Sequence, residues 1–173
     1  MNKEHFWAIV EQSRIGANGD QDAQETTLKA ILVTLSVDEI EQFDVLFREA
    51  MRESYRWDLW AAAYLIQGGC SDDGFEYFRY WLISLGRERF EATLRNPDTL
   101  AEFIEDTDDQ EGREFEAFAI AVHRVWEQKT GKDILEMPAL ADPRPYVPAG
   151  EPWEEDDDEY FARAFPKLVA KFG

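Results

Sequence analysis

A cysteine and two aspartates lie close together in a short glycine-rich stretch, "GGCSDDG", which covers residues 68–74. The thiol of Cys70 would act as a nucleophile if the start of a following helix lowered its pKa. A thiol nucleophile also needs a base, and the two histidines of the chain are His5 and His123. Both lie far from Cys70 in sequence, which a fold can correct. Cys70 and His123 are therefore the candidate catalytic residues.

The same stretch also has a complete structural interpretation, as a turn between helices predicted over 55–66 and 74–85. Gly68 or Gly69 suits the left-handed position after a helix, because glycine has no Cβ to clash there. A small polar side chain suits the N-cap of the next helix, and the candidates for that cap are Ser71, Asp72 and Asp73. Since a free cysteine is usually buried and inert, we favour the turn and predict no catalysis there.

Acidic side chains raise a second chemical hypothesis, a metal ion held by aspartates. Asp72 and Asp73 would supply two oxygens, and the acidic segment "DTDDQEG" would supply others. The candidates in that segment are Asp106, Asp108 and Asp109. The segment lacks the spacing of a calcium-binding loop, and neither histidine belongs to a zinc-hydrolase motif. We therefore favour helix capping for the first pair and a solvated loop for the others, and we expect no metal and no cofactor.

Arginines form the most unusual polar pattern, because three of them are spaced by four residues, which predicts one helix face. They are Arg48, Arg52 and Arg56. Three interpretations stay open: pairing with Glu49 and Glu53, docking of the acidic segment 154–159, or binding of an anion or a partner. We favour the first two, because exposed ion pairs and internal contacts are the common fate of such residues.

Two tyrosines complete the set of candidate binding residues. Tyr77 and Tyr80 lie off the apolar face that Phe75 and Phe78 give to the predicted helix 74–85. Because tyrosine is enriched where proteins meet partners, the pair is a candidate for lining a second interface or a groove.

Apolar residues recur at helical spacing along the chain, and cap signals separate the periodic segments. Ser36 and Glu39 have the spacing of a capping box, and Asn96 followed by Pro97 is a helix-start signal. No segment shows the alternation of a convincing strand. We predict an all-α protein, a single-domain orthogonal bundle of six to eight short helices. Helical segments are expected at residues 3–14, 27–35, 37–51, 55–66, 74–85, 87–94, 97–106 and 113–129.

Prolines concentrate after residue 130, at Pro138, Pro143, Pro145, Pro148 and Pro152. Because proline lacks an N–H and resists helix interiors, we predict an extended arm over 131–153 that follows a helical body over 1–130. Residues 154–173 regain helical periodicity, and their apolar side chains are too many to leave in water, so we expect them to pack on the body. These side chains are Phe161, Phe165, Leu168 and Phe172.

The chain has 173 residues and a net charge of −19, and two segments carry most of that charge. Residues 102–116 hold eight carboxylates against Arg113, and residues 151–159 hold seven carboxylates and no base. This field would repel phosphates, so we expect no direct binding to a nucleic-acid backbone, whereas a basic protein partner is permitted.

Other features of the sequence predict the cellular compartment of the protein. No apolar run is long enough to span a bilayer, so we expect no membrane association. The first apolar stretch contains charged residues, which is not typical of a signal peptide. The chain has one cysteine, so it forms no internal disulfide and suits a reducing compartment. We therefore expect a cytoplasmic protein, and its oligomeric state stays open.

Residues 57–101, "WDLWAAAYLIQGGCSDDGFEYFRYWLISLGRERFEATLRNPDTLA", resemble a bacterial family of domains of unknown function, the one numbered four thousand two hundred and forty. The opening "FWAIVEQSR" and the closing "FPKLVAKF" are also similar to the ends of that family. The resemblance covers most of the chain and implies a bacterial cytoplasmic protein. It implies no catalytic residues, because the family has no settled activity.

Two hypotheses of function follow. The first is a non-enzymatic protein-interaction or regulatory module with an acidic surface. The alternative is a metal-assisted hydrolase that uses the aspartates of the 72–73 and 106–109 segments. Clustered charge and the missing catalytic spacing favour the first.

Overall fold

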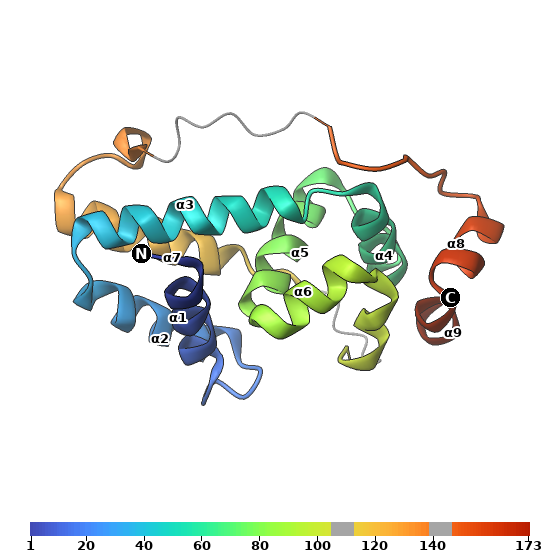
Figure 1. The fold of residues 1–173 in the computed structure, drawn as a ribbon, viewed down its shortest axis with the longest axis horizontal. Coiled ribbons are helices and arrows are strands. Elements are labelled where there is room, and N and C mark those ends of the chain that lie inside the picture. The colour runs from blue at the N-terminus through green and yellow to red at the C-terminus, as the bar shows by residue number, and fades with distance from the viewer. Residues whose placement is uncertain (105–112, 139–146) are drawn as a thin grey trace.

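The computed structural model describes residues 1–104, 113–138 and 147–173. The predicted all-α class is confirmed, because these residues form nine α-helices, the 3-10 helices η1 (Pro97–Glu102) and η3 (Ile134–Glu136), and no strand. Figure 1 shows α3 and α7 running alongside each other, with α8 and α9 at the end of the molecule beyond α4. The α-helices are α1 (Lys3–Arg14), α2 (Gln21–Thr34), α3 (Val37–Glu53), α4 (Trp57–Gln67), α5 (Asp72–Ser84), α6 (Arg87–Arg95), α7 (Glu116–Thr130), α8 (Asp158–Ala164) and α9 (Pro166–Phe172).

Side-chain caps set the starts of several helices. Ser36 and Glu39 form the predicted capping box, in which each side chain accepts a hydrogen bond from the other's backbone N–H. Helix α2 begins at Gln21 rather than at Thr27, because the side chain of Asp20 accepts the N–H of Ala23 at 2.9 Å. The connection before α2 is therefore shorter than the gap between the helices predicted at 3–14 and 27–35.

Two other predicted helix starts take a different form. Asn96 caps the segment that begins with Pro97, as predicted, but the segment is the 3-10 helix η1 rather than an α-helix. Helix α7 begins at Glu116 and not at Arg113. Arg113 is buried instead, and its Nη1 donates to the carbonyl of Ile66 at 2.9 Å, so it ties the approach to α7 onto α4.

One hydrophobic core joins the N-terminal and C-terminal helices. Helix α1 packs on α2, and α7 packs on α2, α3 and α5. Aromatic side chains from several helices fill the interior, and the largest fully buried ones include Phe6, Phe43, Phe75, Phe78, Phe90, Phe118 and Trp126. Of these side chains, Phe75, Phe78 and Phe90 come from residues 57–101, the stretch that resembles the family.

The C-terminal segment forms two short helices where one was expected. Helix α8 ends at Ala164 and α9 starts at Pro166, because a proline at that place has no N–H to continue the first helix. This break contributes to a total of nine α-helices in the described residues, against the six to eight predicted. The side chains of Phe161, Phe165 and Leu168 lie in the core, and Phe172 packs partly buried against it. Of the predicted extended arm, residues 134–136 form η3 and residues 139–146 lie outside the described ranges.

Candidate functional site

Residues 68–71 of the glycine-rich stretch form the turn between α4 and α5, and residues 72–74 already belong to the first turn of α5. Gly68 follows α4 with φ +65°, the left-handed conformation that glycine allows at no steric cost. Of the three candidate caps, Ser71 makes the bond: its Oγ accepts the N–H of Gly74 at 3.1 Å. Trp60 Nε1 donates to the carbonyl of Cys70 at 3.0 Å, so α4 also holds the middle of the turn.

The surroundings of Cys70 oppose a nucleophilic role. Burial, together with the nearby carboxylate of Glu114, raises the pKa of its thiol from 9.0 to about 12. A thiol with that pKa stays protonated near neutral pH, and the protonated form is a poor nucleophile. The chemistry of the site therefore fits the predicted structural turn.

The other candidate catalytic residue, His123, belongs to a polar cluster between α3 and α7. Its Nε2 lies 3.6 Å from Oδ1 of Asp44, whose side chain is 1% exposed. The other carboxylate oxygen of Asp44 accepts a hydrogen bond from Nε of Arg48 at 2.6 Å. The cluster thus ties a buried carboxylate to two basic side chains. Its most direct consequence is to join α3 to α7.

The carboxylates proposed as metal ligands belong to two separate segments of the chain. Asp72 and Asp73 are exposed in the first turn of α5, where the positive end of the helix dipole stabilises their negative charge. Asp106, Asp108 and Asp109 lie outside the described residues. Within the described part of the chain, no group of three or more histidine, cysteine or acidic side chains is arranged to hold a metal ion.

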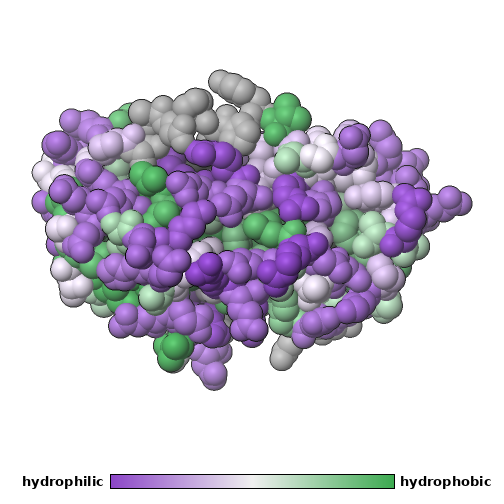
Figure 2. Space-filling view, in the orientation of Figure 1, coloured by the Kyte–Doolittle hydropathy of each residue, from purple (hydrophilic) through white to green (hydrophobic). Residues whose placement is uncertain are grey.

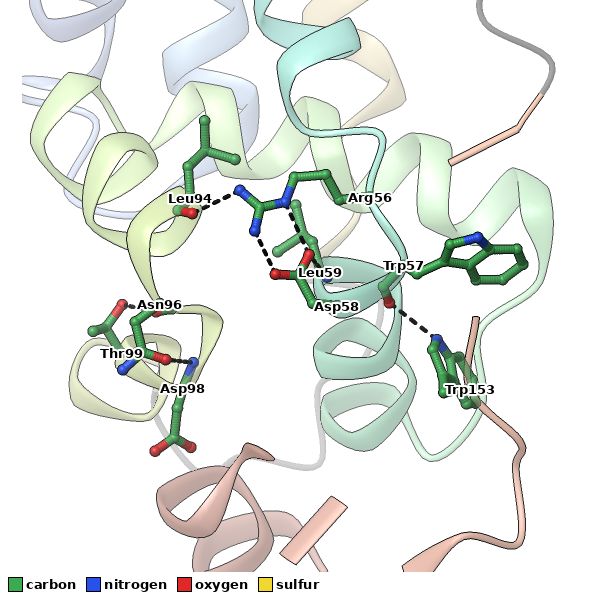
Figure 3. A network of polar contacts seen from close by, with 9 residues as sticks. All are labelled: Arg56, Trp57, Asp58, Leu59, Leu94, Asn96, Asp98, Thr99 and Trp153. Atoms are coloured by element: carbon green, nitrogen blue, oxygen red, sulfur yellow. Dashed lines mark hydrogen bonds and ion pairs between the residues drawn. The ribbon is translucent and has the colours of Figure 1, made fainter. Parts of the chain in front are cut away.

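The interpretation of the three arginines as one helix face is wrong for Arg56, because α3 ends at Glu53 and Arg56 precedes α4. Its guanidinium forms an ion pair with Asp58, and Nη1 donates to the carbonyl of Leu94 at 2.8 Å (Figure 3). Arg56 therefore connects α4 with α6.

The carboxylates expected to pair with the arginines also contact a lysine. The carboxylates of Glu49 and Glu53 contact Nζ of Lys3, at 3.6 and 3.0 Å, which ties α3 to α1. Arg48 uses Asp44, one turn earlier on α3. Arg52 is exposed near the end of α3. Arg48 and Arg52 belong to α3 and Arg56 precedes α4, so the three arginines do not share one continuous helix.

The tyrosine pair lies where α5 meets α3. The ring of Tyr80 stacks on that of Phe47 at 5.6 Å, and its hydroxyl bonds to Glu76. The ring centroids of Tyr77 and Tyr80 lie 6.3 Å apart. The nearby carboxylate of Glu116 raises the pKa of the Tyr77 hydroxyl. Both rings are half-buried, so their main observed contacts are internal.

Sequence reasoning did not identify the residues that receive the C-terminal segment. Ala149 forms the one isolated bridge recorded among the described residues: it donates to the carbonyl of Tyr55 and accepts from the N–H of Trp57, both at 2.9 Å. Trp153 Nε1 then donates to the carbonyl of Trp57 at 3.0 Å (Figure 3). Because tryptophan is enriched at interfaces, the residue type of Trp153 was the sequence signal that could have predicted this contact.

Asp98 follows the predicted helix start at Asn96 and Pro97, and its side chain makes a longer-range contact that no sequence pattern predicted. It is 4% exposed, and its carboxylate accepts the N–H groups of Lys167 at 3.0 Å and Leu168 at 2.9 Å. These N–H groups belong to the first turn of α9, where Pro166 offers none and no cap comes from Phe165. A residue of η1 thus caps a helix of the C-terminal segment.

The acidic run Glu154–Glu159 stands on the surface between two anchored aromatic residues. All six acidic side chains are exposed, whereas Trp153 is half-buried and Phe161 is buried. Tyr64 donates to Glu155 at 3.3 Å, and burial together with that carboxylate raises the pKa of the Tyr64 hydroxyl. Figure 2 shows hydrophilic residues gathered at the end of the molecule where α8 lies.

The fold and these contacts define an all-helical domain that carries its own C-terminal segment on one face. Among the described residues, no helix combines the length and apolar character needed to cross a bilayer. The chain belongs to the family described as "Protein of unknown function (DUF4240)", whose model matches residues 1–128. The comparison with curated proteins gave no match, and neither did the comparison with solved structures.

Proposed function

We propose that this protein is a non-enzymatic protein-interaction module that binds a basic partner protein through an acidic surface. The observation that carries the proposal is the acidic run Glu154–Glu159, six exposed carboxylates held on the surface between Trp153 and Phe161. We also propose the cytoplasm as its compartment, since a single cysteine suits reducing conditions.

The flanking residues Trp153 and Phe161 pack against the body of the protein and so hold the acidic run in place. Helix α8 begins inside the run, because the side chain of Asp157 accepts the N–H of Tyr160 at 2.9 Å. A partner meets carboxylates that are already positioned, so binding costs less conformational entropy than with a loose acidic tail. Complementary charge also raises the association rate and the selectivity for a basic partner, and both effects weaken with salt.

The test is affinity capture from the native cell extract at low and at high salt. One variant converts all six acids of 154–159 to their amides, Glu→Gln and Asp→Asn. The matched control converts six exposed acids on other elements, so that the net charge changes equally. These control positions are Glu4, Asp22, Asp38, Glu53, Glu88 and Glu116.

We expect a basic protein that the wild type retains at low salt and releases at high salt. The 154–159 variant should lose that protein, and the control should keep it. Equal capture by all three proteins would contradict the proposal, because net charge and position would then make no difference.

A further inference from the structure

The face formed by α4 and η1, here called the α4–η1 face, holds residues 147–173 through contacts of several kinds. The groups that receive the segment lie between Tyr55 and Arg113, inside the part of the chain that the family model matches. The segment itself lies outside residues 1–128. The family domain therefore carries a surface that fits a segment beyond the matched region.

Backbone groups provide the first set of contacts. Ala149 pairs with Tyr55 and Trp57 through two hydrogen bonds of 2.9 Å, in the manner of an added strand. The indole N–H of Trp153 donates to the carbonyl of Trp57, and its ring lies 5.0 Å from that of Tyr64. An extended peptide with a tryptophan four residues after its bridging residue matches this part of the face.

The carboxylate of Asp98, which belongs to the α4–η1 face, provides the second set of contacts. Its carboxylate is buried and points at the N–H groups of Lys167 and Leu168. A buried carboxylate is costly unless it accepts hydrogen bonds, so Asp98 favours a segment that supplies backbone donors at this place.

Basic and apolar side chains of the segment complete the match. Lys167 Nζ binds Glu102 at 2.6 Å, and Lys171 Nζ donates to the carbonyls of Ala101 and Ile104. The ring of Phe172 lies under the guanidinium of Arg113 at 5.2 Å. The apolar side chains Phe161, Phe165 and Leu168 are buried in the same arrangement.

We infer that the α4–η1 face is a peptide-binding site whose second ligand is residues 147–173 of another copy of this chain. The groups that make these contacts are present in every copy of the chain, which is the condition for exchange of an identical element. A second copy presents the same bridging residue, tryptophan, lysines and apolar side chains. In the wild type the chain's own segment competes at an effective concentration on the order of mM, so the monomer dominates in dilute solution.

Two full-length variants test the exchange by complementation. The Asp98→Lys variant has a defective face and an intact segment. The Phe165→Asp/Leu168→Asp variant has an intact face and a defective segment. Mixed together, they offer one intact face and one intact segment, and we expect a 1:1 heterodimer of twice 20.1 kDa by light scattering. Each variant alone stays monomeric.

Circular dichroism establishes that both variants are folded, and a labelled synthetic peptide of residues 147–173 supplies a second measurement. The Phe165→Asp/Leu168→Asp variant should bind this peptide, and a peptide carrying the same two substitutions should bind on the order of tenfold more weakly or worse, because it loses two apolar side chains that are buried on the face. Should either variant unfold, both peptides are titrated against the wild type at concentrations above the mM level at which its own segment competes, where the same ranking is expected. Folded variants that form no heterodimer, or peptides that bind equally, would overturn the inference.

Discussion

The carboxylate of Asp98 accepts the backbone N–H of Leu168 at 2.9 Å, across 70 residues of sequence. Asp98 lies in η1, within the family-matched region, and Leu168 is fully buried in α9 beyond it. A charged acceptor thus replaces the local cap that α9 lacks.

The Asp98→Ala substitution should therefore destabilise the whole fold. Hydrogen bonds to a buried charged group contribute about 1.5–3 kcal/mol, so we expect a loss of that size in the free energy of unfolding, measured by urea denaturation. The control is Asp156→Ala, at an exposed position in the acidic run, which should change stability by less than about 0.5 kcal/mol. Equal effects at the two positions would show that the Asp98 contact is not stabilising.

The ion pair of Asp44 and Arg48 should behave as a coupled unit. Asp44 is 1% exposed at its side chain and Arg48 is 15% exposed, so the Asp44→Ala variant leaves a nearly buried cation without its carboxylate. Breaking such a pair costs about 3 kcal/mol or more. In the double variant with Arg48→Ala the unpaired charge is gone, so its loss should be clearly smaller than the sum of the single losses. Additive losses in this cycle would contradict the coupling.

Cys70 should be slow to react with a thiol reagent in the native protein at pH 8. Its pKa of about 12 leaves little thiolate there, and the labelling rate should keep rising with pH above 9. In denaturant the thiol should react at the rate of an ordinary cysteine. Fast native labelling at pH 8 would contradict the assignment of Cys70 to a structural turn.

The raised pKa of Cys70 also predicts the direction in which the stability of the protein changes at alkaline pH. The unfolded thiol loses its proton near pH 9, while the folded thiol keeps it up to about pH 12. The unfolded state then binds fewer protons than the folded state, so stability falls as pH rises through this window. The Cys70→Ala variant should show a shallower alkaline fall in its urea midpoint than the wild type. Parallel curves for the two proteins would exclude this contribution.

Deleting residues 151–173 should lower the melting temperature strongly. The deletion removes three buried apolar side chains, Phe161, Phe165 and Leu168, and burial of each one contributes roughly 1.5–3 kcal/mol before entropy is subtracted. It also exposes the α4–η1 face. An unchanged melting temperature, with the shortened protein monomeric, would mean that the segment is a detachable tail.

Gly86 should tolerate a side chain poorly. It joins α5 to α6 with φ +91° and ψ 168°, a conformation that is essentially restricted to glycine. We expect the Gly86→Ala variant to lose about 1–3 kcal/mol in urea denaturation. The control is Gly74→Ala inside α5, where the backbone is helical and alanine is the better helix former, so its change should be much smaller. A loss at Gly86 no larger than that at Gly74 would argue against backbone strain.

Local patterns predicted the helices well, because helix formation depends on neighbours three and four residues apart. The capping box of Ser36 and Glu39 is present as expected, and the turn after α4 uses one of the two expected glycines. The start of α2 was missed although Asp20 was a suitable cap, since its apolar residues are sparse before Leu28. Local rules also left three candidates for the cap of α5, and only the backbone geometry selected Ser71.

The sequence by itself determined the all-α class, the approximate helix positions and the acidic character of the chain. These properties follow from composition and from interactions within a few residues, so they are readable without a fold. Tertiary structure alone decided which partners the charged residues take. Arg56 binds Asp58 and Leu94 rather than joining Arg48 and Arg52, and Asp98 caps α9 across 70 residues. Such choices depend on which helices pack together, and no local spacing encodes that packing.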